Sequence, residues 1–516
     1  MSAISGTIPP GLRELYAKHD QQQVFQYADS GVVTGDVVDA LVAQLSDIDP
    51  ERMNELFRST MGLAGGNTTA AAAGDEKAAA AGDEKEDEQN MEPIESFVSL
   101  DSATAEVKEA WYAAGLKAVS EGKIAVVVLS GGQGTRLGFS GPKGMYNIGL
   151  PSQKTLFQLQ AERLRRVCNL AAQRFPRTCD AADGPAAVTA AVANRISIPL
   201  YIMTSPLNDA ITREFFAKNK HFGLPESDVF FFPQGTLPCM TPEGKIMLES
   251  AGRVAMAPDG NGGIYPALQR TGALDNMLAR GVEHLHVFSI DNALVKVADP
   301  HFLGYCILTG ADCGNKSVWK AQPDEKVGVV VKRGGKPCVV EYSEMDQQAC
   351  ERRDADGKLV FGAGNICNHY FSFAFLADVV LPGMSDMYHV AHKKIPAAVG
   401  PSGDMVKPLT NNGIKLESFI FDVFPLSRNM VLFEAPRADE FAPVKNAPGT
   451  ATDSPNTARE MISQQARRWV VAEGAELGPG DGNCEISPLV SYGGEGLQDK
   501  VAAKKKLEVP FHLEDN

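Results

Sequence analysis

A glycine-rich loop that carries two cations follows a short apolar run in the first third of the chain. Residues 124–128 (IAVVV) are apolar and mostly β-branched, which indicates a buried parallel strand. The next residues, 129–138, read LSGGQGTRLG, and residues 142–144 read PKG. Glycine lets the backbone turn sharply and approach a ligand, and successive N–H groups in such a turn converge on an anion. With the charges of Arg136 and Lys143 added, the pattern predicts a phosphate-binding loop.

Two well-known phosphate loops do not fit this pattern. The Walker loop requires Gly-Lys-Ser/Thr, whereas Lys143 follows a proline and precedes Gly144. The Rossmann fingerprint G-x-G-x-x-G fails by one residue, because Gly132, Gly134 and Gly138 are spaced G-x-G-x-x-x-G. What remains, GGxGTRLG followed by PKG, resembles the signature loop of sugar-nucleotide pyrophosphorylases. A plain tight turn is the structural alternative, but the number of specified positions after a buried strand argues against it.

Strands and helices alternate around this loop, which predicts an α/β fold with a doubly wound, mostly parallel, Rossmann-like sheet. An antiparallel patch is expected beside it, because two apolar runs flank the turn residues 333–336 (RGGK). The expected strands are residues 124–129, 200–203, 229–232, 285–290, 327–331 and 338–342, and the expected helices are residues 51–61, 105–120, 209–218 and one that begins after Thr155.

Polar residues that follow the expected strands are the next candidates, since ligands of open α/β sheets bind outside the carboxyl ends of the strands. Gln234 could pair with a pyrimidine edge, and the turn at 257–263 (APDGNGG) could lie against a flat base; a plain loop remains the alternative for both. Asp291 could hold a hard cation or simply solvate a strand end. The paired histidines at 284/286 and 389/392 have no third ligand nearby in sequence, so we expect structural roles for them.

The whole pattern resembles the eukaryotic-type UDP-N-acetylhexosamine (UDP-N-acetylglucosamine) pyrophosphorylases over roughly residues 105–447. One departure is Ser130, which stands where the family usually has Ala. The matching stretches are residues 129–138, 142–147, 154–163, 235–238, 256–263, 291–300, 310–314, 340–344, 363–366, 412–415 and 444–447.

The resemblance implies a nucleotidyltransferase fold and a role for each matching residue. The UTP-binding set it implies contains backbone of the loop, cations for the phosphates, and contacts to uracil: Leu129, Ser130, Gly131, Gly132, Arg136, Lys143, Gln234, Gly260, Asp291 and Lys415. The sugar-phosphate set it implies is Asn261, Glu341, Tyr342, Asn365 and Lys445.

The implied reaction is UTP + N-acetyl-α-D-glucosamine 1-phosphate = UDP-N-acetylglucosamine + diphosphate. Arg136, Lys143 and Lys415 would be the catalytic cations, and Asp291 would hold Mg²⁺, with Mn²⁺ as an alternative. The preference among N-acetylglucosamine, N-acetylgalactosamine and glucose 1-phosphate stays open at this point. A binding protein without catalytic activity is the alternative from another class, but the retention of Arg136, Lys143 and Asp291 argues against it.

Composition limits the partners and the location. The 516 residues carry a formal net charge of −15, which disfavours nucleic acid and anionic membranes. The nine cysteines are odd in number and form no Cys-x-x-Cys, as in reduced cytosolic proteins. No signal peptide or membrane span is evident, so we expect a cytoplasmic enzyme, with organellar import by a non-standard signal left open. We expect a monomer and leave a weak homo-oligomer open.

Three domains are expected. Residues 1–104 form a helical region that contains a disordered acidic insert at about 63–92, where AAAAGDEK occurs twice in succession. Residues 105–415 form the catalytic domain and residues 416–516 a small C-terminal domain. A surface insertion is expected at residues 177–194, which are rich in Ala, Asp and Thr.

Overall fold

The computed structural model describes residues 6–62, 91–176, 196–384, 387–502 and 506–515. The acidic repeat and the insertion expected at 177–194 lie outside the described residues. The last two residues assigned to the acidic insert, Met91 and Glu92, instead belong to strand β1 (Met91–Pro93). They do so because β1 pairs antiparallel with strand β12 (Val329–Arg333), which satisfies their backbone groups.

The chain divides into two compact units. The smaller one, unit 1, comprises Met1–Ala78, Gln234–Pro266 and Gly383–Asp422, and unit 2 comprises Ala79–Pro233, Ala267–Pro382 and Val423–Asn516. This division differs from the three consecutive domains expected from sequence. The N-terminal helices share a unit with two later segments, and the C-terminal residues from Val423 onward belong to unit 2.

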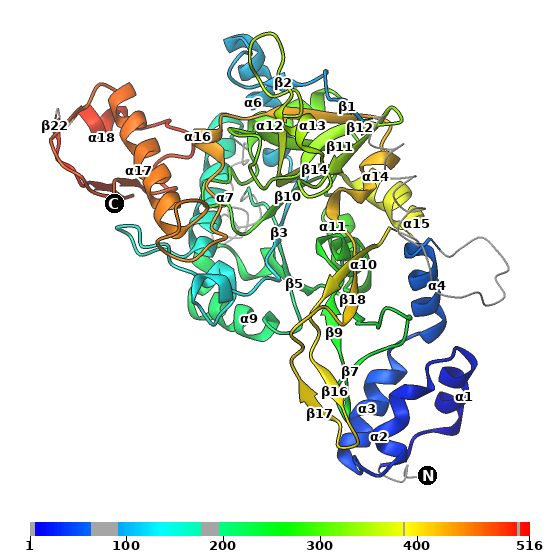
Figure 1. Ribbon diagram of the computed structural model, residues 1–516. Helices are drawn as coiled ribbons and strands as arrows, with labels where there is room; N and C mark the ends of the chain where they lie inside the picture. Colours follow the sequence, from blue (N-terminus) through cyan, green and yellow to red (C-terminus); the bar gives the residue numbers. More distant parts are fainter. Residues whose placement is uncertain (1–5, 63–90, 177–195, 385–386, 503–505, 516) are drawn as a thin grey trace. The chain divides into compact units, whose positions relative to one another are not determined.

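Unit 2 is built on an eleven-stranded sheet, which confirms the expected mostly parallel α/β fold with an antiparallel patch (Figure 1). Strand β14 lies antiparallel between β11 and β10, so it separates two parallel blocks. The β12–β13 hairpin turns at Arg333↔Lys336, where the sequence predicted it. The main strands, in spatial order, are β2 (Val98–Ser99), β19 (Met430–Glu434), β11 (Cys313–Trp319), β14 (Ala363–Ser372), β10 (His284–Ser289), β3 (Ile124–Leu129), β4 (Leu200–Thr204) and β5 (Val229–Pro233), with β1, β12 and β13 (Lys336–Val340) off this path.

Helices cover both faces of this sheet, as a doubly wound fold requires. Alternate residues of β3 pack in one apolar cluster with helices α6 (Ala105–Ser120), α7 (Leu156–Arg174) and α12 (Pro300–Leu308). On the other face, the hydroxyl of Tyr201 in β4 donates to Asn276 of helix α11 (Ala273–Ala279) at 2.8 Å. Helices α6 and α12 cross closely, because a Cβ on Gly304 would lie 1.8 Å from the Trp111 carbonyl oxygen.

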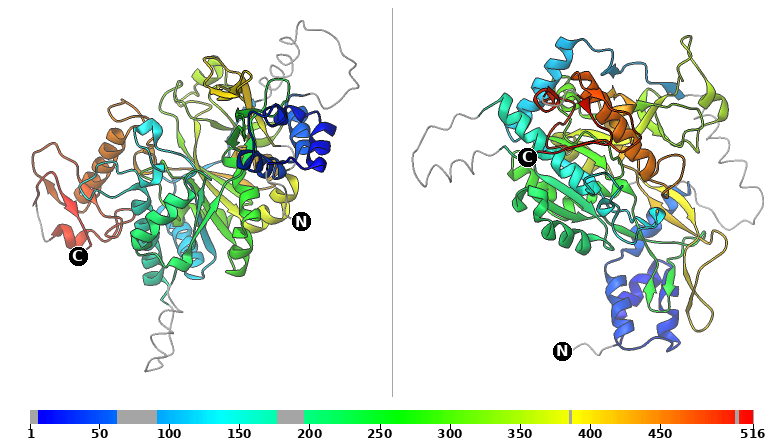
Figure 2. Two further views of the ribbon diagram at one scale, coloured as in Figure 1. Left: turned by 90° about the horizontal axis from the view of Figure 1, so that it is seen from below. Right: turned by 90° about the vertical axis from the view of Figure 1, so that its left-hand side faces the viewer.

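The C-terminal part of unit 2 carries its own small apolar cluster. Helix α17 (Pro455–Ala472) starts with a capping box between Ser454 and Thr457. It packs against two short parallel pairs (orange and red in Figure 2). These pairs are β20 (Glu476–Leu477) with β22 (Lys506–Leu507), and β21 (Glu485–Ile486) with β23 (His512–Leu513). Among the described residues, no helix is long and apolar enough to cross a membrane.

Unit 1 joins the N-terminal helices to several β-hairpins. Helices α1 (Pro10–Lys18), α3 (Asp36–Ser46) and α4 (Pro50–Thr60) share one core with Met240, Ile246, Leu248 and Ile414. The Gln21 side-chain amide donates to the Gly244 carbonyl at 2.7 Å, and its oxygen accepts the Ile246 N–H at 2.9 Å. The antiparallel strand pairs are β6 (Thr236–Pro238) with β9 (Met256–Pro258), β7 (Leu248–Ser250) with β8 (Arg253–Val254), β15 (His389–Lys393) with β18 (Gly413–Glu417), and β16 (Ala397–Val399) with β17 (Asp404–Val406).

Candidate active site

The phosphate loop predicted from sequence is held in one compact turn after β3. The Gly134 N–H donates to the Gly141 carbonyl at 2.9 Å, and the Lys143 N–H donates to the Gly132 carbonyl at 3.2 Å. Arg136 is exposed and Lys143 is half-buried. Neither side chain forms an ion pair with a residue in the described part of unit 2. Both cations are therefore available to an anionic ligand.

The first two residues of the loop have already used part of their backbone hydrogen-bonding capacity. The Ser130 N–H donates to the Met203 carbonyl at 2.9 Å, and the Leu129 carbonyl accepts the Ile290 N–H at 3.2 Å. Gly131 and Gly132 donate no such bond in the described structure. The backbone donors that are free for a phosphate therefore begin at Gly131.

Asp291 lies at the same edge of the sheet as this loop. Strands β3 and β10 are parallel, with Leu129 paired to Ser289, so their carboxyl ends meet. The Asp291 carbonyl accepts the Val444 N–H at 2.9 Å, which holds the segment that carries Lys445 at the same place. The loop cations, Asp291 and Lys445 therefore gather at one edge of the unit 2 sheet.

Cys367 lies near Asp291 and Lys445, and sequence reasoning did not single it out. Burial, together with the Asp291 carboxylate, raises the pKa of its thiol to about 12, and the Lys445 ammonium opposes this rise. Cys367 has a φ of 53°, which is unusual for a residue other than glycine. It falls where the β11–β14 register shifts, between the pairs Asn315↔His369 and Ser317↔Asn365. Bulges of this kind redirect neighbouring side chains.

Glu341 and Asn365 approach the same edge. Glu341 directly follows β13, and burial raises the pKa of its carboxyl, with Glu344 adding to the rise and Lys445 opposing it. The Asn365 side-chain oxygen accepts the Cys367 N–H at 3.1 Å. The amide NH₂ of Asn365 is thus oriented and remains a donor. Tyr342, which also belongs to the expected sugar-phosphate set and to unit 2, is 43% exposed.

The remaining candidates belong to unit 1 and form their own group. The β6–β9 pairing Thr236↔Pro258 places Gln234 and Gly260 at one end of that hairpin. Gly260 has a φ of 88°, and a Cβ there would lie 2.2 Å from the Ser418 carbonyl oxygen. The Asn261 side-chain oxygen accepts the Ile420 N–H at 3.0 Å, so that atom has a structural role.

Lys415 lies on strand β18 (Gly413–Glu417) of unit 1 and is half-buried. It forms no ion pair with any described residue of the unit. Its charge opposes the effect of burial, which raises the pKa of Cys239 to about 11. Lys415 is therefore a third cation that is free to bind an anion.

The donor set at Asp291 fits a cation that is shared with substrate phosphates. No group of three or more His, Cys, Asp or Glu side chains that could hold a metal occurs among the described residues. Mg²⁺ commonly takes only one or two protein carboxylates and completes its octahedron with phosphates and water. The histidines instead bind protein groups: His284 contacts the Tyr370 hydroxyl at 2.8 Å, and His286 contacts the Asn368 side chain at 2.8 Å.

A buried ion network fixes the segments on either side of Asp291. The ammonium of Lys316, which is fully buried, lies 2.5 Å from carboxylate oxygens of both Asp299 and Glu440. Burial would raise the pKa of Asp299, but Lys316, His301 and Lys296 together hold it well below its usual range. Asn292 donates to the Glu440 carbonyl at 2.7 Å and so connects the network to Asp291.

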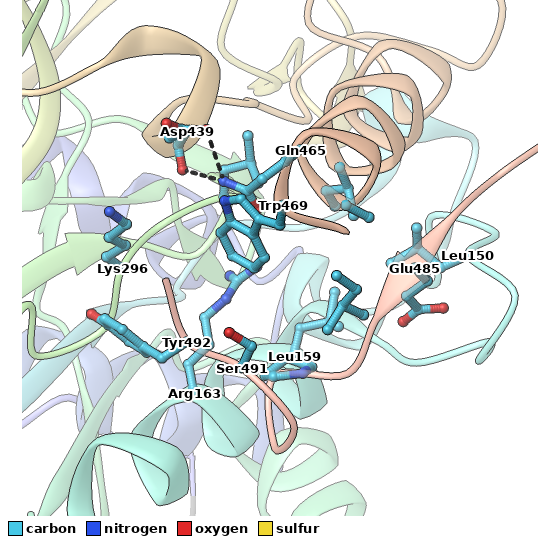
Figure 3. A pocket seen from close by; sticks show the side chains of 15 residues that line it. Leu150, Leu159, Arg163, Lys296, Asp439, Gln465, Trp469, Glu485, Ser491 and Tyr492 are labelled. Carbon is cyan, nitrogen blue, oxygen red and sulfur yellow. Dashed lines mark hydrogen bonds between the residues drawn. The ribbon is translucent and has the colours of Figure 1, made fainter. Parts of the chain in front are cut away.

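A small cavity lies beside this network but cannot hold a nucleotide (Figure 3). Its walls come from α7, the segment around Lys296, α17 and the residues near Tyr492. The free volume of about 30 Å³ is enough for one or two waters only. The buried Arg163 Nη1 has no protein hydrogen-bond partner, which is consistent with a water there.

Comparisons with known proteins show which chains this one is similar to. The family model described as UTP–glucose-1-phosphate uridylyltransferase matches residues 78–475. The chain is 45% identical to a UDP-N-acetylhexosamine pyrophosphorylase-like protein 1 from Xenopus tropicalis, over 80% of this chain and 81% of that protein. It is 40% identical to UDP-N-acetylglucosamine diphosphorylase 2 from Arabidopsis thaliana, over 96% and 94%.

Among solved structures, the chain resembles the uridine diphosphate N-acetylglucosamine pyrophosphorylase from Trypanosoma brucei. The TM-score is 0.79 at 29% identity, over 99% of both chains. A UDP-glucose pyrophosphorylase from Leishmania major shares the fold at a TM-score of 0.54 and 17% identity, over 80% of this chain and 76% of that one.

Proposed function

Because the chain belongs to the UTP–glucose-1-phosphate uridylyltransferase family, we propose that it forms UDP-N-acetylglucosamine and diphosphate from UTP and N-acetyl-α-D-glucosamine 1-phosphate. The names of relatives that are 40–45% identical support this acceptor. The observation that carries the proposal is the grouping of Arg136, Lys143, Asp291 and Lys445 at one edge of the unit 2 sheet. Such a grouping suits a reaction between two polyanions.

The reaction needs charge neutralisation rather than a general base. A phosphate oxygen of the sugar phosphate attacks the α-phosphorus of UTP in line, and the bond to the bridging oxygen of the β-phosphate breaks. The nucleophile is already an anion, so its approach is opposed by charge repulsion. Arg136 and Lys143 would reduce that repulsion and stabilise the leaving diphosphate, while Lys445 would hold the acceptor phosphate. Lys415 would contribute a further cation to UTP phosphate.

A divalent cation, Mg²⁺ or Mn²⁺, would supply additional stabilisation of phosphate charge when bound. Asp291 is the residue that would hold it. The Asp291 carbonyl accepts the Val444 N–H at 2.9 Å, so Asp291 adjoins the segment that carries Lys445. Asp291 would thus keep the cation close to the group that holds the acceptor.

The other candidates fit recognition of the base and the sugar. Gln234 offers a donor and an acceptor on one amide, and Gly260 brings backbone close, which suits uracil. The oriented NH₂ of Asn365 suits the carbonyl oxygen of an N-acetyl group, and Glu341 and Tyr342 suit sugar hydroxyls. The Asn261 amide NH₂ would contact the sugar, because its oxygen is engaged by Ile420.

The test is incubation with UTP, Mg²⁺ and a panel of sugar 1-phosphates, with UDP-sugars as the readout. We expect the highest kcat/KM with N-acetylglucosamine 1-phosphate, reduced activity with the galacto epimer, and little with glucose 1-phosphate, which lacks the acetamido group. Excess chelator should abolish turnover, and Asp291→Asn should raise the concentration of Mg²⁺ that is needed. Binding of UTP without any UDP-sugar would instead identify a non-catalytic binding protein.

A further inference from the structure

A second pocket of unit 2 has a composition that the proposed reaction does not use. It has a volume of about 290 Å³ and lies between the β12–β13 hairpin, the residues after β1 and the start of β19. This volume is close to the lower limit for small-molecule sites in proteins. We call it the hairpin pocket.

Lys332 on β12 and Arg428 just before β19 line the hairpin pocket, and Lys336, whose side chain leaves β13 on the opposite face from Lys332, lies at its rim. Among the described residues, no carboxylate lines the pocket, although the chain as a whole carries a net charge of −15. None of the three side chains forms an ion pair with a described residue. The pocket therefore concentrates unpaired positive charge.

Two carboxylates lie near the pocket, those of Glu92 and Asp312, and neither forms an ion pair with its cations in the described structure. Glu92 lies opposite Lys332 in the β1–β12 pairing, but the two form no ion pair. Asp312 accepts the backbone N–H groups of Arg428 and Asn429, at 2.8 and 3.1 Å. The Oδ2 atom of Asp312 thereby fixes the backbone that presents the Arg428 side chain.

The rest of the pocket wall is apolar. Val330, Met430 and Leu432 belong to one small apolar cluster that continues beneath the hairpin. Pro337 and Pro425 add rigid apolar surface at the sides. A ligand that fits both parts of the wall carries a phosphate group and a flat or apolar body.

The hairpin pocket is separate from the candidate active site. Met430 pairs with Cys313, Cys313 with Phe371, and Phe371 with Leu285, so these residues form one row across the sheet. Strand β10 continues for four residues beyond Leu285, roughly 13 Å, and ends at Ser289. Asp291 lies two residues past that end. Arg428 precedes this row, at the amino end of β19, whereas the loop and Asp291 lie at the carboxyl edge.

We propose that the hairpin pocket is a second ligand site, which binds a small organic phosphate with an apolar or aromatic body. Lys332 and Arg428 hold the phosphate group, Lys336 adds positive charge at the rim, and Val330, Met430 and Leu432 contact the body. This site does not depend on the proposed reaction.

The test uses 1-naphthyl phosphate as the probe, with the full-length protein saturated with UTP and titrated by calorimetry. Saturable 1:1 binding is expected, and inorganic phosphate and 1-naphthol should each bind at least 10-fold more weakly. The variant K332Q/K336Q/R428Q should bind the probe at least 10-fold more weakly than the unmodified chain. The matched variant K117Q/K218Q/K220Q removes three exposed cations of the same unit and should change affinity less than 2-fold.

Two further measurements keep the test decisive. The variant K332R/K336R/R428K keeps all charges and should retain binding within 3-fold, which separates lost charge from a disturbed fold. The proposal is overturned if the probe does not bind, if both glutamine variants lose equal affinity, or if UTP competes with the probe. The last result would assign binding to the candidate active site.

Discussion

Lys143 is the residue whose removal tests the phosphate loop most directly. Its backbone is fixed by Gly132 and its side chain has no ion-pair partner in the described structure, so its charge is positioned without being neutralised. Loss of one such contact costs on the order of 10²-fold in turnover. We expect that loss for Lys143→Ala when diphosphate release is measured with saturating substrates.

The matched control is Lys218→Ala, which removes an exposed lysine at the end of helix α9 (Asp209–Lys218). It should leave turnover within 2-fold. Turnover of Lys143→Ala close to that of the control would exclude the Lys143 charge from the reaction.

Two buried histidines make unit 2 sensitive to acid. Burial lowers the pKa of His286 to about 4 and that of His369 to about 3. In the unfolded chain a histidine titrates near 6.5, so below that pH the unfolded state binds more protons and the folded state loses stability. The loss continues as pH falls toward the folded pKa values, at about 1.4 kcal/mol per pH unit for each residue.

His369→Phe tests this effect, because both ring nitrogens of His369 are buried without a hydrogen-bond partner. Near pH 7 we expect the free energy of unfolding of the variant to equal or exceed that of the unmodified chain, since phenylalanine leaves no polar group unsatisfied at this position. At pH 4.5 its advantage over the unmodified chain should grow by about 2–3 kcal/mol. Denaturant unfolding at the two pH values measures this, with the exposed His392→Gln as control. If the stability difference between the variant and the unmodified chain does not change with pH, the lowered pKa of His369 is contradicted.

Sequence patterns single out the charged candidate residues but not the residues that orient them. Arg136, Lys143 and Asp291 are recognisable because they follow glycine turns or end apolar strands. Cys367 gave no such signal, because its φ of 53° and its place beside Asp291 and Lys445 arise from the register shift in β14. A conformation imposed by neighbouring strands cannot be read from the local residue pattern.

At the scale of elements, strands with uniform apolar runs were predictable and β14 was not. Residues 124–129 are apolar throughout and form β3, and the turn 333–336 forms the expected hairpin. Strand β14 reads AGNICNHYFS, in which polar and apolar residues do not alternate. It is a strand because β11 and β10 bond to it on either side, and this long-range pairing overrides local propensity.

The turn at Gly260 supports a second stability prediction. Its φ is 88°, and a Cβ at this position would lie only 2.2 Å from the Ser418 carbonyl oxygen, which leaves no room for a side chain. Gly260→Ala should destabilise unit 1 by roughly 2–4 kcal/mol and raise the KM for UTP at least 10-fold.

Gly281→Ala is the control for backbone strain alone. Gly281 also has a positive φ, 72°, but a Cβ there would meet nothing within 4 Å. Gly281→Ala should lower the free energy of unfolding by about 1 kcal/mol and leave the KM for UTP unchanged. Equal effects of the two substitutions, measured by thermal unfolding and initial rates, would show that the contact with Ser418 is unimportant.

At the scale of the whole molecule, the sequence predicts the N-terminal helices as helices, but it does not predict which later segments form a unit with them. Met53, Leu56 and Phe57 were expected on one face of a helix and are buried on α4. What they pack against lies some 190 residues later in the sequence, in the segment that includes Met240 and Ile246. Periodicity identifies an apolar face, but it does not identify its partner.

Two deletions should therefore have opposite outcomes. Removing residues 1–62 would expose Ile246, Leu248 and Ile414, which share the unit 1 core with the N-terminal helices, and would break the bonds of Gln21 to Gly244 and Ile246. We expect the truncated chain to bind a hydrophobic dye, to aggregate and to lose activity.

Removing residues 78–85, one copy of AAAAGDEK, deletes no apolar side chain larger than Ala and should leave the melting temperature and activity unchanged. Dye binding, sedimentation and thermal unfolding of the two variants provide the comparison. A truncated chain that stays monomeric and active would show that the helices are dispensable to unit 1, whereas a loss of stability in the repeat deletion would show that the repeat takes part in folding.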